Sequence, residues 1–121
     1  MKVIRTSIKD LDTNILMKYR MTQSKTAKAV SKMTDEELDA LYRVVDFVEY
    51  EDVNQRGEVV TILSFLCDDE QVYAAQSSTF RETFNRIVDV VGDHRCFTIA
   101  IISSVSKAGR KFMDCDLRGI D

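Results

Sequence analysis

Three cationic side chains gather near the C-terminal end of the chain, at Lys107, Arg110 and Lys111, and Phe112 follows them directly. The Ala-Gly pair between the first two cations predicts a tight turn between two strands. Cations neutralise phosphate groups, and an aromatic ring offers a face on which a base can stack. The segment therefore has the composition of a phosphate clamp with an adjacent stacking face. A solubilising hairpin tip would have the same composition.

Aromatic rings on which a base could stack occur in two other parts of the sequence. Tyr50 and Tyr73 fall in predicted strands, where together they would form a stacking platform. Half-buried tyrosines with the hydroxyl at the rim of a core are the alternative. Tyr19 stands between Lys18 and Arg20, which joins a ring to two cations, although packing against the body of the protein explains this tyrosine equally well.

The net charge of −3 conceals an asymmetry along the chain. Residues 1–32 carry eight Lys/Arg and two Asp, a balance of +6, whereas residues 33–121 carry nine Lys/Arg and 18 Asp/Glu, a balance of −9. Lys25, Lys28 and Lys32 follow a spacing of three and four, which would place them on one face of a helix. A basic segment on an acidic body indicates a polyanion near that segment. Charge neutralisation within the protein and a solvated helix face are the alternatives.

The sequence contains no recognisable set of catalytic residues. The only histidine, His94, lies in a polar turn, and no carboxylate pair falls in an apolar pocket. The three cysteines lie in widely spaced apolar contexts, which indicates reduced core thiols and neither a disulfide framework nor a zinc site. We expect no cofactor, no metal and no membrane association, because no run reaches the length of about 18 apolar residues that a span needs. A cytoplasmic location is the expectation.

The order of the predicted elements indicates a small β-barrel. Apolar stretches and turns predict five strands, with a helix between the third and the fourth. The strands are expected at about residues 44–53, 58–67, 71–76, 96–104 and 110–117, and the helix at about 79–91. This mainly β layout, with one to three helices, is that of a five-stranded OB-like Greek-key barrel (the oligonucleotide/oligosaccharide-binding barrel). A helix-capped open sheet of the same order is the alternative.

Local signals place the helix ends. Thr34 and Glu37 have the spacing of a capping box, and so do Thr79 and Glu82. Apolar residues recur at helical spacing behind the second box, and Gly92 ends that stripe. Residues 21–33 are rich in Ser, Thr and Lys, which indicates a loop or a poorly packed helix. We therefore expect residues 1–33 to form a basic N-terminal arm that is partly mobile, and residues 34–121 to form the OB-like barrel domain.

Three segments, residues 72–84, 104–112 and 16–27, resemble small single-stranded-DNA-binding proteins of phages and prophages of Gram-positive bacteria. The resemblance covers about a third of the chain. It implies an OB-type barrel that coats single-stranded DNA during phage replication or recombination, together with replication or recombination proteins, in the host cytoplasm.

The combined expectation is non-enzymatic binding of single-stranded DNA with little sequence preference. The candidate residues share a cationic or aromatic side chain: Lys18, Tyr19, Arg20, Lys25, Lys28, Tyr50, Tyr73, Lys107, Arg110, Lys111 and Phe112. A protein-binding adaptor, or an inhibitor of a host factor, is the alternative function. Because the strand at 58–67 is very apolar for a lone small barrel, we expect a homodimer or a larger homo-oligomer.

Overall fold

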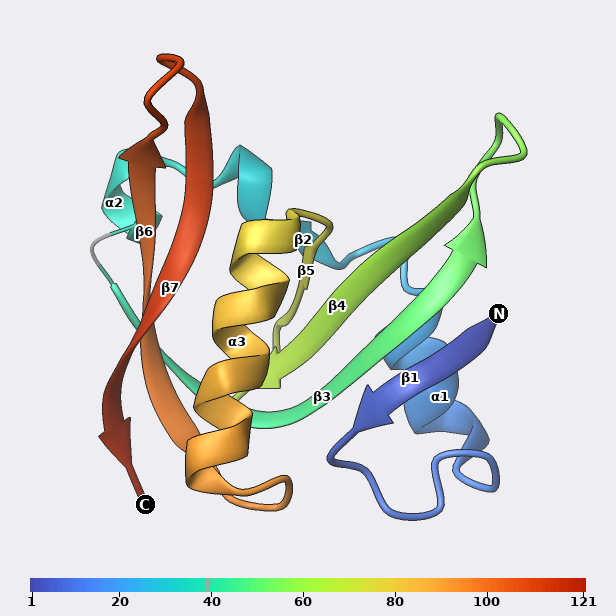
Figure 1. Ribbon diagram of the computed structural model, residues 1–121. Coiled ribbons are helices and arrows are strands. Elements are labelled where there is room, and N and C mark those ends of the chain that lie inside the picture. Colours follow the sequence, from blue (N-terminus) through green and yellow to red (C-terminus); the bar gives the residue numbers. More distant parts are fainter. Residues whose placement is uncertain (39) are drawn as a thin grey trace.

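The computed structural model describes residues 1–38 and 40–121 of the chain (Figure 1). The described strands are β1 (Lys2–Thr6), β2 (Lys28–Ala29), β3 (Leu41–Val53), β4 (Val59–Cys67), β5 (Val72–Ala75), β6 (Phe97–Val105) and β7 (Lys111–Ile120). The described helices are α1 (Ile15–Thr22), the single 3-10 turn η1 (Val30–Lys32), α2 (Asp35–Leu38) and α3 (Ser78–Val91). None of the helices in these two ranges has both the length and the apolar character to cross a membrane.

The strands belong to one curled sheet with the order β2-β5-β4-β3-β6-β7, and β1 pairs with β3. Only the β2–β5 pair is parallel among the described strands. β3 pairs with β6 through Leu41–Val44 and with β4 through Val44–Val53, so the sheet bends around this strand into a half-barrel (Figure 1). The mainly β class is confirmed.

The strand number differs from the expected five. The five expected strands correspond to β3, β4, β5, β6 and β7, with α3 between the third and fourth of them. Two short strands, β1 and β2, come from the N-terminal segment and bring the described sheet to seven. Tertiary pairing explains β2: two residues make a strand only because β5 offers them a free edge.

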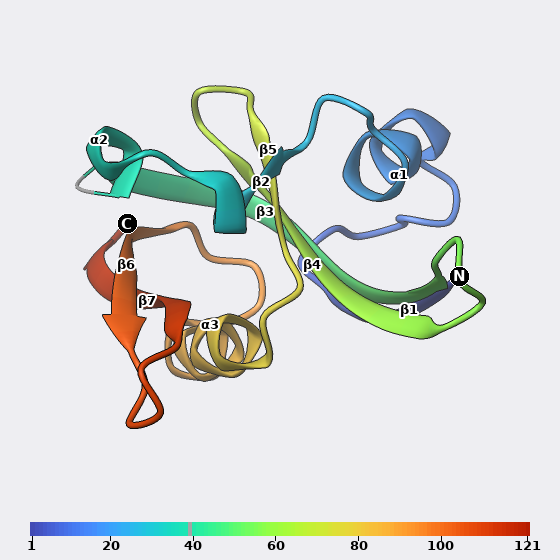
Figure 2. The ribbon, with the colours of Figure 1, turned by 90° about the horizontal axis from the view of Figure 1, so that it is seen from above.

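Helix α3 fills the concave side of the half-barrel (Figures 1 and 2). Its apolar stripe is buried there, and Phe84 is the centre of an aromatic cluster. The ring of Phe84 lies 5.4 Å from the rings of Phe47 and Phe97 and 5.6 Å from that of Phe65, measured between centroids. Buried aromatic side chains contribute much of the folding free energy of a core. The packing of α3 on the concave side is therefore a main source of stability for the half-barrel.

The two expected capping boxes have different outcomes. Thr34 and Glu37 form theirs, because the Thr34 amide donates to Glu37 Oε1 (3.1 Å) and the Glu37 amide donates to Thr34 Oγ1 (3.4 Å). The second box is wrong: Ser77, not Thr79, is the N-cap of α3, and its Oγ accepts from the Phe80 amide at 3.4 Å. The Ser77 backbone is non-helical, with φ −54° and ψ 127°, as is usual for an N-cap residue whose hydroxyl accepts from the first turn.

The N-terminal segment packs on the opposite face of β3, β4 and β5 from α3 (Figure 2). Met21 of α1 is 2% exposed, and the Tyr50 hydroxyl donates to the Thr22 carbonyl at 3.0 Å. The apolar side chains buried in this second cluster are Leu11, Met21, Val48, Tyr50, Leu66 and Val72. Residues 1–33, expected as an arm, are thus packed in this structure: β1 and β2 are strands of the sheet, and α1 lies on its outer face. Their mobility in solution stays a prediction.

Replacing Met21 with Ala should lower the free energy of unfolding by about 2–5 kcal/mol, because it empties a buried site between α1 and the sheet. Denaturant unfolding followed by circular dichroism measures the loss. Leu16→Ala on the same helix is the matched control; Leu16 is 84% exposed, so its truncation should change stability by no more than about 0.5 kcal/mol. Equal stability of the two variants would contradict the packing of α1 on the sheet.

Candidate nucleic-acid interface

The β6–β7 hairpin carries the cationic cluster at the tip of the half-barrel (Figure 1). The turn is closed by local hydrogen bonds: the Ser106 amide donates to the Arg110 carbonyl (2.8 Å), and the Arg110 amide donates to Ser106 Oγ (3.1 Å). Gly109 adopts φ +79°, a conformation that L side chains rarely take. Lys107, Arg110 and Lys111 are all exposed around this turn.

Within residues 1–38 and 40–121, these three cations have no carboxylate partner, whereas six of the other fourteen Lys/Arg do. Arg5 of β1 donates to Asp89 of α3 at 2.7 Å and to Asp93 at 2.5 Å, which raises the pKa of Arg5 against the opposing effect of its partial burial. Similar pairs hold Lys18, Lys28, Arg43, Arg81 and Arg118. The hairpin tip therefore keeps an uncompensated positive potential on an acidic protein.

Phe112 is the second paired residue of β7, after Lys111, and lies opposite Ser104 of β6. Its side chain is partly buried and points to the opposite face of β7 from Lys111, because neighbouring residues of a strand alternate. The next residue, Met113, points to the other side of the strand and into the core. The hairpin thus carries three exposed cations and a partly exposed ring within six residues, whereas a stacking role of Phe112 stays a prediction.

Tyr50 and Tyr73 do not form a stacking platform in this structure. Each is 5% exposed, and they lie on opposite sides of the sheet in different apolar clusters. Tyr50 is covered by α1, whereas Tyr73 faces the concave core and stacks on Phe65 at a centroid distance of 5.4 Å. The expected stacking role of both rings is corrected, because a buried ring has no face to offer a base.

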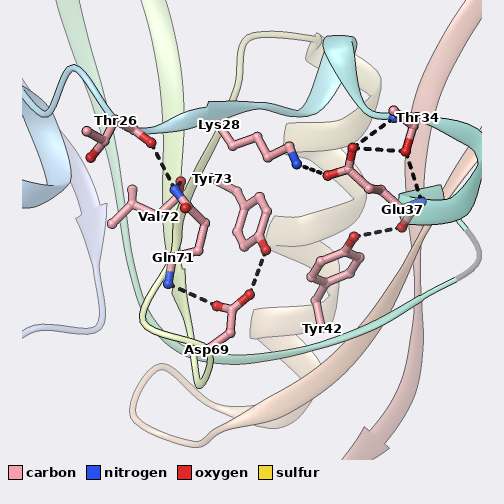
Figure 3. A network of polar contacts seen from close by, with 9 residues as sticks. All are labelled: Thr26, Lys28, Thr34, Glu37, Tyr42, Asp69, Gln71, Val72 and Tyr73. Carbon is pink, nitrogen blue, oxygen red and sulfur yellow. Dashed lines mark hydrogen bonds and ion pairs between the residues drawn. The ribbon is translucent and has the colours of Figure 1, made fainter.

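The Tyr73 hydroxyl belongs to a polar network that ties residues 26–37 to the sheet (Figure 3). It donates to Asp69 Oδ2 at 2.7 Å, and the neighbouring Tyr42 hydroxyl donates to the Glu37 carbonyl at 2.7 Å. Lys28 forms an ion pair with the Glu37 carboxylate, and its hydrogen bond to that group is the largest cause of the lowered pKa of Glu37. Lys28 is thus engaged within the protein and does not form part of the free cationic surface.

Helix α1, which carries Lys18, Tyr19 and Arg20, lies away from the β6–β7 hairpin in both views of the ribbon (Figures 1 and 2). Tyr19 is 59% exposed on α1, but Lys18 pairs with Asp12 at 3.1 Å and Arg20 donates to the Glu70 carbonyl. Lys25 is exposed in the turn before β2. The expected helical face of lysines is wrong, since residues 25–32 form a turn, a strand and η1.

Sequence reasoning missed a cavity beside the hairpin. It lies between η1, the end of β5 and Met113 of β7, and its volume is about 290 Å³. Lys32 of η1 is exposed next to it and has no carboxylate partner in the part of the chain that the structure describes. The only local signal was a run of small residues, Ala74-Ala75-Gln76-Ser77-Ser78, which by itself indicates no pocket.

In comparisons of the chain with protein-family models, curated proteins and solved structures, no match was found. The resemblance to phage single-stranded-DNA-binding proteins therefore stays a prediction. The function of the chain has to be inferred from the geometry of its described residues.

Burial raises the pKa of Tyr42, Tyr50 and Tyr73 above the ordinary value of 10.0. Because the fold holds the neutral hydroxyls, their contribution to stability should be full below about pH 10 and fall as the pH rises through the raised values. Unfolding by urea at a series of alkaline pH values measures this loss. Tyr73→Phe should weaken the alkaline dependence, and the control Tyr19→Phe should not. Ionisation of the buried hydroxyls at the ordinary value, with native circular dichroism, would contradict their burial.

Proposed function

We propose that the chain is an OB-type barrel protein that binds single-stranded DNA with little sequence preference. The order of β3, β4, β5, α3, β6 and β7 supports the barrel assignment, since β6 returns to pair with β3 as the fourth strand of an OB barrel pairs with the first. On this assignment, the β6–β7 hairpin is the loop between the fourth and fifth barrel strands, which proteins of this class use for binding oligonucleotides.

The observation that carries the proposal is the unpaired cationic hairpin, which also carries the partly exposed Phe112. Lys107, Arg110 and Lys111 would neutralise phosphates and supply the salt-dependent part of the affinity. Phe112 would stack on one base, a contact worth about 1–3 kcal/mol for any of the four bases. Such contacts read no base edge, and this agrees with low sequence preference.

The rest of the charge distribution favours a single strand over a duplex. The whole chain carries −3, so only local cationic surfaces attract a polyanion. A flexible single strand can follow a short cationic rim, whereas a stiff duplex would also approach the acidic body. Binding without catalysis, protection of exposed strands in phage replication or recombination, and a place in the host cytoplasm complete the proposal.

A protein-binding adaptor or inhibitor is the second candidate function, and α1 supplies the observation that favours it. Ile15, Leu16 and Tyr19 are 74%, 84% and 59% exposed on the outward side of this helix. With Arg20 beside them, they suit a partner whose surface is apolar and acidic. That partner is a host protein or a second copy of this largely acidic chain.

Lys107→Gln combined with Lys111→Gln should weaken binding of a poly-dT strand and lower the salt slope of log K by about 1.4, since each lost phosphate contact removes about 0.7. Fluorescence anisotropy at several salt concentrations measures both effects. The matched control is Lys2→Gln combined with Lys9→Gln, which removes the same charge from exposed positions on and just after β1.

Equal weakening by the two double variants would assign the effect to net charge and contradict the hairpin site. Wild-type protein that binds duplex as tightly as poly-dT, or that binds neither, would contradict the function itself.

Leu16→Ser combined with Tyr19→Ser tests the second candidate. If α1 docks a second copy, the double variant should shift a concentration-dependent oligomer towards monomer in analytical ultracentrifugation, because the apolar contact is lost. If the helix serves a host protein, capture of that protein from host lysate should fail. Unchanged oligomeric state and unchanged capture would remove α1 as a docking surface.

A further inference from the structure

The cavity between β5 and β7 exists because the half-barrel stays open at this edge. These two strands would pair in a closed barrel of this strand order. Here β5 pairs with β2 instead, with Ala29 opposite Ala74, and η1 follows directly. The side chains at the gap are small, at Ala29, Ser31 and Ala75, so about 290 Å³ is left between them and Met113.

The cavity has an apolar floor and a polar rim. Val30, Ala75 and Met113, which line it, are 1%, 4% and 8% exposed and belong to the main core. Gln76 and Ser31 are exposed at its edge, and in the described part of the chain neither side chain makes a hydrogen bond with another protein group. The rim therefore offers an amide with both donor and acceptor and a free hydroxyl.

Positive charge stands on both sides of the opening. Lys32 follows Ser31 in η1, and Lys111 lies two residues before Met113 on the same face of β7. Both lysines are exposed, and neither is paired with a carboxylate of residues 1–38 or 40–121. Helix α3 begins at the cavity with Ser77 as its N-cap and has no acidic residue in its first turn, which adds positive potential.

We propose that this cavity is a nucleobase subsite of the single-strand-binding surface. One base of the bound strand inserts between η1 and β7, and its flanking phosphates lie against Lys32 and Lys111. This inference rests on the proposed function and extends it from the hairpin to η1.

The charge and the size of the cavity select this occupant. An apolar floor between two cations suits a flat ring that carries a phosphate on either side. Pockets for small molecules begin at about 300 Å³, so the cavity suits one base and not a longer segment. The Gln76 amide can pair with the edge of any base, because it both donates and accepts. The subsite thus keeps the low sequence preference of the surface.

Ala29→Leu would place a larger side chain in the cavity and close it. The probes are a dT strand of about 16 nucleotides and an abasic strand of the same length and charge. Ala29→Leu should lower the affinity for the dT strand about tenfold, as expected when one base loses its contact. It should leave the affinity for the abasic strand within about twofold, because the phosphate contacts remain.

Ala40→Leu is the matched control at an exposed alanine outside the cavity, and it should change neither affinity. Gln76→Ala is a second variant that carries little risk to folding, since Gln76 is exposed, and it should lower only the dT affinity. Thermal unfolding of each variant, followed by circular dichroism, shows that the fold is kept.

The outcomes distinguish failure of the base subsite from failure of the proposed single-strand binding. Wild-type protein that binds neither strand overturns both. Wild-type protein that binds the two strands equally, or an Ala29→Leu protein that weakens both in proportion, overturns the base subsite and leaves electrostatic strand binding standing. Unchanged dT binding by Ala29→Leu likewise overturns the base subsite.

Discussion

Burial of β3 on both faces is the constraint on which the rest of the structure depends. Phe47 and Val48 are neighbours in the strand and point to opposite sides, yet they are 2% and 0% exposed. Phe47 contacts the ring of Phe84 in α3, and Val48 lies under the N-terminal layer. Two hydrophobic clusters therefore meet at one strand. A strand buried on both faces needs cover from two layers, which is why a segment with a basic, polar sequence is held on the sheet.

This double cover decides where a ligand can bind. The outer face of β4 and β5 is the face on which OB barrels bind oligonucleotides, but here α1 and the following turn lie over it. Tyr50, which lies on the same side of the sheet, becomes part of the packing. What remains open is the rim of the half-barrel, where the β6–β7 hairpin, η1 and the end of β5 come together. The proposed strand-binding surface follows that rim.

Electrostatics separates structural cations from free ones. Ion pairs with acidic side chains connect the elements of the body. Arg5 of β1 pairs with Asp89 of α3, and Lys28 of β2 pairs with Glu37 of α2. Glu49, on the face of β3 towards α3, is held by Asn85 (3.3 Å) and by Arg81 (3.5 Å). The hairpin cations lie too far along a projecting turn to join these pairs. Their lack of partners is thus a consequence of the fold and the basis of the proposed function.

The sequence by itself determined the features that depend on neighbouring residues. The Thr34 capping box, the buried stripe of α3, its end at Gly92 and the order of strands around it follow from local periodicity and turn chemistry, and the structure confirms them. The cationic hairpin with Phe112 could be predicted for the same reason.

Only the tertiary structure decided which face of each strand is covered and which cation meets a carboxylate. Tyr50 was predicted as a stacking residue, but α1 packs on it. The partner of Arg5, Asp89, lies 84 residues away in the sequence and 2.7 Å away in the structure. Burial and ion pairing depend on approach in space, and approach between distant segments is not encoded in local spacing.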